Sequence, residues 1–242
     1  MDTRRGARSA SHRKDGASPR LSPRGDETRT LILDTAEAMF VEHGFSGVTM
    51  RALTARAGVN LAAVNYHFGS KDQLLLEVFR RGSGSINRER ARLLREARTE
   101  AGGKALPVRT ILHALFAPPI RATLQTRSSL SHPAAGGRSI YMQFIARAAL
   151  DGPEEMRTMI ERDVAHLKRF VDALSEALPQ LPRADLLWRF HFAMGALHSL
   201  YHDLRRLEAL SGGPLALDSA DDLVERVVSF AAAGLEAPRA QN

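Results

Sequence analysis

Two very short helices in close succession constrain the fold of this chain more than any other feature. Thr49 is a typical N-cap residue, and apolar side chains follow it at helical spacing until Gly58 ends the helix. Asn60 can cap a second short helix immediately, so the link between the two helices spans only residues 57–60. A glycine turn this tight predicts a helix-turn-helix over 49–68, a motif that lays its second helix in the major groove of DNA.

The flanking sequence predicts one helix before this motif and a long helix after it. From Thr28, apolar side chains recur with a period of 3.6 residues until Gly44, a typical left-handed C-cap. Ser70 and Gln73 form a capping box at the start of the long helix. Three short helices that lead into a long one therefore predict a DNA-binding domain over 28–80.

The rest of the chain is also expected to be helical, because prolines and glycines separate segments of period 3.6 and no strand-like alternation occurs. The clearest helix is 154–178, with apolar residues at i, i+3 and i+4 spacing. Further helices are expected at 106–116, 119–128, 138–150, 184–210 and 219–235. The fold class is therefore all-α, with a second helical domain over 81–237 and a tail over 238–242.

The N-terminal segment 1–27 is rich in arginine, serine, glycine and proline and has almost no large apolar side chains. Such a segment cannot bury enough surface to offset its chain entropy. It carries seven basic and four acidic side chains. We expect a disordered basic arm.

Composition excludes several classes of protein. A chain of 242 residues is long enough to bury a real core. Without cysteine there can be no disulfide, thiolate nucleophile or cysteine-type zinc site. No stretch is long and apolar enough for a transmembrane helix, so a soluble cytoplasmic protein is expected. The sequence contains neither a G-x-S-x-G nor a Walker A motif, which disfavours an enzyme.

Charge supports DNA binding through its distribution and not through its sum. The chain has a formal net charge of +7, yet segment 28–80 has five basic and five acidic side chains. No Asp or Glu occurs between His43 and Lys71, a run that contains Arg51 and Arg56. Carboxylates on a surface that approaches phosphates would repel DNA, so this run is expected to face it.

The residues around the two short helices form a joint pattern, which also extends upstream and downstream of them. The strings are Thr49-Met50-Arg51-Ala52-Leu53, Ala57-Gly58-Val59 and Tyr66-His67-Phe68-Gly69-Ser70-Lys71. This pattern closely resembles the N-terminal domain of the TetR family of bacterial transcriptional regulators. The resemblance covers about residues 28–80.

The resemblance implies that the second short helix faces base edges while neighbouring residues hold the phosphate backbone. Asn65 can make the paired amide contact that adenine accepts, whereas Leu61 and Ala62 offer apolar contact, as to a thymine methyl. Val64 and Phe68 are expected in the core. The predicted DNA contacts are Thr49, Arg51, Asn60, Leu61, Ala62, Asn65, Tyr66, His67 and Lys71.

The resemblance further implies that 81–237 binds a ligand and forms a dimer. The order of its prolines and aromatic runs looks like a subgroup that includes fatty-acid-responsive regulators, which implies a small apolar or acyl-type effector. Aromatic, methionine and polar residues between helices are candidates for the ligand site. They are Phe116, Met142, Gln143, Arg147, Trp188, His191 and His198.

The last two helices are expected to pair with their copies in a second protomer. The candidate interface residues are Phe190, Met194, Leu197, Tyr201, Leu223, Val227 and Phe230. His198 and His202 have a spacing that could chelate zinc, but without the glutamate of a hydrolase motif we expect pocket lining or interface burial, and no metal or cofactor. A two-fold dimer predicts a palindromic operator.

The sequence therefore predicts a homodimeric regulator, most often a repressor in this family, that leaves its double-stranded DNA operator when a small molecule binds the C-terminal domain. Two alternatives remain open. The regulator could bind DNA constitutively, with the C-terminal domain serving only as a dimerisation scaffold. The less favoured alternative is an all-α enzyme.

Overall fold

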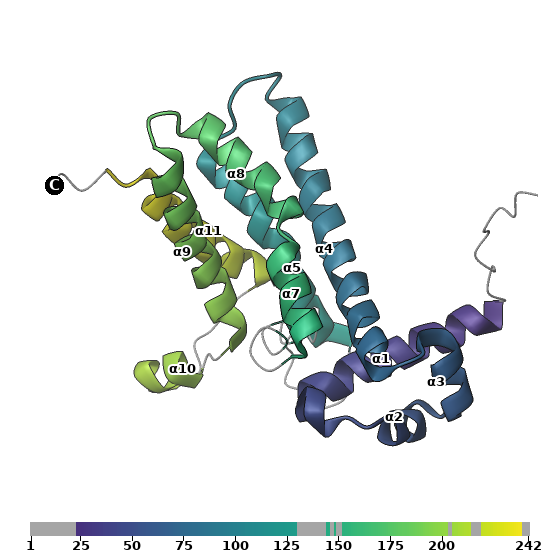
Figure 1. Ribbon diagram of the computed structural model, residues 1–242. Helices are drawn as coiled ribbons and strands as arrows, with labels where there is room; N and C mark the ends of the chain where they lie inside the picture. Colours follow the sequence, from purple (N-terminus) through teal and green to yellow (C-terminus); the bar gives the residue numbers. More distant parts are fainter. Residues whose placement is uncertain are drawn as a thin grey trace, which may run out of the picture.

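The structure, a computed structural model, describes residues 23–129, 144–145, 148, 152–202, 205–213 and 219–238, and these ranges contain helices and no strands. The all-α fold class is confirmed. In Figure 1, α1 to α3 form a head at one end of the long helix α4. Along the rest of α4 packs α5, and α9 and α11 lie farther from α4. The helices are α1 Pro23–Gly47, α2 Met50–Ala57, α3 Leu61–Phe68, α4 Lys71–Glu100, α5 Val108–Ser129, α7 Glu154–Arg162, α8 Ala165–Ala177, α9 Arg183–His202, α10 Arg205–Ser211 and α11 Ala220–Glu236.

The helix ends inside the head follow the local signals of the sequence. Thr49 Oγ1 accepts a hydrogen bond from the Ala52 backbone N–H at 3.1 Å, and Asn60 Oδ1 accepts one from Ala63 N–H at 2.7 Å. Gly58 adopts the left-handed conformation, with φ 65°, in the turn between the helices. The predicted helix-turn-helix is therefore present with its predicted caps.

Helix α1 differs from its expected bounds at both ends. It begins at Pro23, so residues 23–27 form its first turn and are not part of a disordered arm. Proline suits this position because its missing N–H has no helical partner there, and Asp26 in the first turn complements the helix dipole. Gly44, with φ 71° and ψ 172°, produces a kink where a stop was expected. Residues 1–22 lie outside the described residues.

Two helices were expected to meet at Pro118-Pro119, but α5 runs through both prolines. Since Pro119 has no N–H, the carbonyl of Leu115, four residues earlier, lacks its usual helical donor. The buried Arg90 on α4 supplies one instead, because its Nε donates to Leu115 O at 2.8 Å. The helix continues because another element provides the missing hydrogen bond.

The expected helix 154–178 is two helices, α7 and α8, because Asp163 leaves the helical conformation, with φ −77° and ψ 53°. The apolar stripe continues across this bend, so periodicity did not reveal it. Of the expected helix 184–210, α9 and α10 are described, and residues 203–204 between them lie outside the described residues. Of the expected helix 138–150, only residues 144–145 and 148 are described, and these are helical.

Two apolar clusters form the core. One joins α4, α5, α8, α9 and α11, where α5 packs against α4 and α11. The other lies in the head, where Phe40 and Phe45 pack with Phe144 at ring distances of 6.4 and 5.6 Å. Met156 of α7 also joins this cluster. The head therefore shares its core with residues of the second domain and is not merely tethered to it by α4.

Candidate nucleic-acid interface

Helix α3 has one buried and one outward face. Val64 and Phe68 pack into the head core, whereas Leu61 and Tyr66 are 49% and 74% exposed. Large apolar side chains gain nothing from water, so their exposure marks a surface that a partner can cover. The outward residues of α3 are Leu61, Ala62, Asn65 and Tyr66.

The start of α2 and the start of α4 meet beside this face. Thr49 is exposed at the N-terminus of α2, where its oxygen already accepts the Ala52 N–H and its hydroxyl hydrogen can donate. Lys71 Nζ donates to the backbone oxygen of Val48 at 2.8 Å. An ammonium group therefore lies next to a helix N-terminus, which is a favourable place for a phosphate.

The two arginines of α2 differ in their partners. Arg56 donates through both terminal nitrogens to the carboxylate of Glu42, with one distance of 2.9 Å. Hydrogen bonding to Arg56 lowers the pKa of Glu42, so this pair stays charged and mutually neutralised. Arg51 is exposed and makes no ion pair in the described part of the chain. Of the two, Arg51 offers the uncompensated charge.

Two acidic side chains of α1, Asp34 and Glu37, point toward α4. Arg81 of α4 holds both Asp34 and Glu37, each at 2.6 Å. Burial raises the pKa of Glu37, while its contact with Arg81 opposes that rise. The carboxylates of Asp34 and Glu37 thus lie at the α1–α4 seam, whereas Glu42, next to the carboxylate-free run, is paired with Arg56.

The end of α3 is fixed by a residue that sequence reasoning missed. The guanidinium of Arg29 lies 5.4 Å from the centre of the Phe68 ring, and its Nη2 is 2.5 Å from Glu77 Oε2. Arg29 thereby links α1 to the ends of α3 and α4. Next to Phe68, the rings of Tyr66 and His67 meet edge to face at 5.2 Å. No local sequence signal predicts the contacts of Arg29, because Glu77 is 48 residues away in the chain and Phe68 is also distant.

The second domain contains a small cavity of about 180 Å³ between α4, α8 and α9. Its lining is largely apolar and includes Ile86, Leu167 and Leu197. Polar or charged groups also reach it, from Ser83, Asn87, Arg90, Asp163, His166 and His198. Of the predicted ligand residues, His198 lines this small cavity. In the described residues no cluster of three or more metal-ligating side chains occurs.

The other predicted ligand residues lie elsewhere. Phe116 is fully buried in the core of the second domain, while Trp188 and His191 lie on the outward face of α9. Neither side chain lines the small cavity. Met142, Gln143 and Arg147 lie outside the described residues.

Helices α9 and α11 present an apolar outer surface. Trp188 and Phe192 are 64% and 65% exposed and stack with ring centres 6.0 Å apart, and Phe230 of α11 is 69% exposed. Arg189 ties the two helices together, because its Nη1 donates to Leu235 O at 2.8 Å near the end of α11. We define Trp188, Phe192 and Phe230 as the aromatic face.

Most of the predicted dimer residues belong instead to the protomer's own core. Phe190, Leu197 and Val227 are buried there, and Met194 and Leu223 are half-buried. These side chains have little surface left for a second copy, since α5 and α8 already cover them. Among the predicted dimer residues whose side chains are described, Phe230 is the exposed one. The side chain of Tyr201 lies outside the described residues.

Two family models match this chain. The model described as "Bacterial regulatory proteins, tetR family" matches residues 32–78, and the model "Tetracyclin repressor-like, C-terminal domain" matches residues 113–234. The first match contains α2 and α3, and the second contains both α9 and the described part of α11 up to residue 234.

Relatives and a solved structure agree with these matches. The HTH-type transcriptional regulator BetI of Agrobacterium fabrum is 29% identical over 197 residues, which cover 81% of this chain and 84% of that relative. The HTH-type transcriptional dual regulator CecR of Shigella flexneri is 37% identical over 59 residues, 24% of this chain and only 26% of that relative. A TetR-like transcriptional regulator from Rhodococcus sp. RHA1 shares the fold, with a TM-score of 0.57, 20% identity and coverage of 89% and 98% of the two chains.

Proposed function

This chain belongs to the TetR family of bacterial transcriptional regulators, and from that premise we propose that it is a homodimeric repressor released from a palindromic operator by a small effector. TetR-family regulators bind DNA and are not enzymes. The observation that carries the proposal is the outward face of α3, where Leu61, Asn65 and Tyr66 are exposed beside a carboxylate-free run. Among the helices of the described chain, none is long and apolar enough to cross a membrane.

In this proposal α3 enters the major groove and its ends hold the backbone. Asn65 reads a base edge, and Leu61 with Ala62 packs against apolar groups there. Lys71 and Thr49, side by side at the start of α2, bind phosphate. Arg51, which has no ion pair among the described residues, adds a cation, whereas Arg56 stays with Glu42. Phosphate contacts supply most of the affinity and base contacts select the sequence.

Effector control is supported by the way the head meets the second domain. Met156 of α7 and Phe144 belong to the head core, and α4 runs from the head to the small cavity. A molecule that prefers one arrangement of α4, α7 and α8 would therefore change the position of the head. Release from DNA then follows from a difference in effector affinity between two arrangements of the dimer.

The alternative is a regulator that binds DNA constitutively and uses its second domain only for dimerisation. A pure dimerisation scaffold has no use for a cavity, yet the second domain has a largely apolar one that a few polar and charged side chains also line. This cavity favours the effector-controlled regulator.

The test measures binding of the full-length protein to the DNA upstream of its own gene by fluorescence anisotropy. We expect specific binding whose log affinity falls linearly with log salt concentration. The variant L61A/N65A should lose at least tenfold in affinity for the specific site, because it removes two base-facing side chains. As a control, Arg98→Gln, which lies far along α4, should bind as the wild type does. Equal affinity for scrambled DNA would contradict the proposal.

A further inference from the structure

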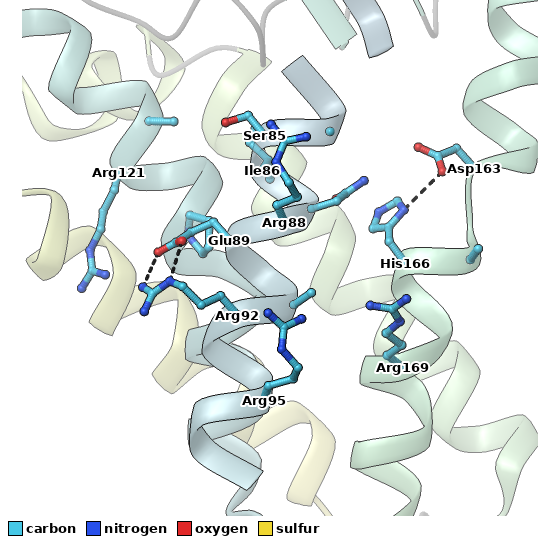
Figure 2. Close-up of a pocket in the computed structure, with 16 residues that line it drawn as sticks. Ser85, Ile86, Arg88, Glu89, Arg92, Arg95, Arg121, Asp163, His166 and Arg169 are labelled. Atoms are coloured by element: carbon cyan, nitrogen blue, oxygen red, sulfur yellow. Dashed lines mark hydrogen bonds and ion pairs between the residues drawn. The ribbon is translucent and has the colours of Figure 1, made fainter. Parts of the chain in front are cut away.

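A second and larger cavity of about 1070 Å³ opens along α4, outside the DNA-binding face. Figure 2 shows arginines of α4 in its middle, Arg121 of α5 on one side, and His166 and Arg169 of α8 on the other. The lining contains five arginines against two carboxylates, Glu89 and Asp163. We define the arginine groove by Arg88, Arg92, Arg95, Arg121 and Arg169.

Two of these arginines are paired with carboxylates of the protein. Arg92 is held by Glu89 at 2.6 Å and by Glu96 at 2.7 Å, and Arg121 is held by Asp221 at 2.9 Å. The remaining three make no ion pair among the described residues. They are Arg88, Arg95 and Arg169. Like charges gathered around one space repel each other unless an anion joins them.

Arginine side chains suit one kind of anion in particular. The planar guanidinium group donates two parallel hydrogen bonds that match the oxygens of phosphate. A single carboxylate would bind one guanidinium group and leave the other arginines of the groove without an anion. Arg88 and Arg95 lie seven residues apart on one stripe of α4, and Arg169 faces them across the groove (Figure 2). Several phosphate charges on one molecule fit this spacing.

The arginine groove adjoins the small apolar cavity. Both cavities are lined by Ile86, Asn87, Asp163 and His166, so these residues form the boundary between them. The small cavity, at about 180 Å³, is close to the roughly 150 Å³ that holds a benzene-sized molecule. It therefore fits an apolar group of about six carbons.

We propose that the effector is an amphipathic molecule with a short apolar group in the small cavity and a head of several phosphate charges in the arginine groove. This inference rests on the proposed function, because it names the class of effector for the same domain. The boundary residues place the junction of the two parts beside Asn87 and His166. Electrostatic attraction between the phosphates and the arginine groove supplies affinity, and the volume of the small cavity limits the size of the apolar group.

The first test uses titration calorimetry of the full-length protein with three probes. Hexanoyl-coenzyme A has a six-carbon chain and a head with three phosphates, coenzyme A is the head alone, and hexanoate is the chain alone. We expect hexanoyl-coenzyme A to bind at least tenfold tighter than either part. If hexanoate or coenzyme A binds as tightly, or if no probe binds, the proposal is overturned.

The second test removes charge from the groove. The double variant R95Q/R169Q keeps the length of both side chains and should weaken hexanoyl-coenzyme A binding at least tenfold, since each arginine can supply charge-assisted hydrogen bonds. The matched control R98Q/R183Q removes two exposed charges from the same domain outside the groove, and should change binding less than twofold. Equal effects of the two variants would overturn the proposal.

A third variant separates the apolar part from the head. Ser83→Leu puts a larger side chain into the lining of the small cavity. It should reduce the preference for hexanoyl-coenzyme A over coenzyme A to less than threefold, with coenzyme A affinity unchanged. An unchanged preference would show that the chain binds elsewhere and would overturn the assignment of the small cavity.

Operator binding distinguishes failure of this inference from failure of the proposed function. Without any probe, R95Q/R169Q should bind operator DNA as the wild type does. A loss of operator affinity would mean that the groove contacts DNA, which overturns the inference and leaves the regulator intact. Failure of wild-type protein to bind any operator would instead overturn the proposed function, while calorimetry still reports on the groove.

Discussion

At the scale of single residues, His166 is a side chain whose protonation is coupled to folding. Burial, reinforced by the charge of Arg90, lowers its pKa, while Asp163, whose Oδ1 is 3.5 Å from His166 Nδ1, opposes that shift and Arg169 adds to it. The unfolded chain therefore binds this proton more readily than the folded protein. The stability that follows is present above the unfolded pKa of about 6.5 and is lost as the pH falls through the lower folded value.

The variant His166→Asn tests this coupling. Between about pH 7.5 and about pH 5.5 we expect the wild type to lose more free energy of unfolding than the variant, by at most about 1.4 kcal/mol per pH unit. Urea unfolding followed by circular dichroism across this range measures the difference. Parallel pH profiles for the two proteins would contradict the assignment of the proton to His166.

The two arginines of α2 provide a second test at the residue scale. Arg51→Gln should reduce the slope of log operator affinity against log salt concentration by about 1, because one phosphate contact is lost. Arg56→Gln is the matched control, since Glu42 already engages Arg56. Its slope should equal that of the wild type. If Arg56→Gln reduced this slope more than Arg51→Gln, the ion pair between Arg56 and Glu42 would have to break when DNA binds.

At the scale of elements, the continuity of α5 depends on a side chain from α4. Arg90 donates to the carbonyl of Leu115 that Pro119 leaves without a helical donor. The same contact fixes α4 against α5, the pair of helices that borders the arginine groove. A helix-breaking residue has here become part of an interface between helices.

A double-mutant cycle tests whether the Arg90 side chain replaces the backbone N–H that Pro119 lacks. Arg90→Met should lower the free energy of unfolding by about 1–3 kcal/mol, because a buried carbonyl loses its partner. Pro119→Ala restores the backbone N–H, so the second substitution should recover part of the loss in the Arg90→Met background. Thermal and urea unfolding measure all four proteins. Strictly additive effects would argue against the compensation.

At the scale of the whole molecule, the aromatic face is the surface that we expect a second copy to cover. Trp188, Phe192 and Phe230 are 64%, 65% and 69% exposed, which makes them candidates for a protein–protein contact. Phe230→Glu should therefore shift the protein toward monomers in analytical ultracentrifugation while its circular dichroism stays helical. Operator affinity should fall at least tenfold, because one head alone reads only a half-site.

The control for this prediction is Leu31→Glu, which changes an exposed leucine of α1 in the head. Its oligomeric state should remain that of the wild type. If Phe230→Glu also sediments as the wild type does, then the aromatic face does not form the interface.

Much of the head could be predicted from the sequence, because its signals are local. The N-caps at Thr49 and Asn60 and the left-handed Gly58 depend on hydrogen bonds within three or four residues. The outward face of α3 also follows from helical spacing once Val64 and Phe68 are assigned to the core. The sequence alone thus determined the helix-turn-helix and the class of protein.

Only the tertiary structure decided those features that depend on contacts between residues far apart in the chain. Only packing shows that Phe190 faces inward and Trp188 outward, because α9 carries apolar side chains on both faces. The run of α5 through Pro119 depends on Arg90, and the bend at Asp163 interrupts no apolar stripe. The arginine groove likewise combines three helices that are far apart in the chain. Local patterns specify where helices begin and end, but only their packing decides which side chains share a space.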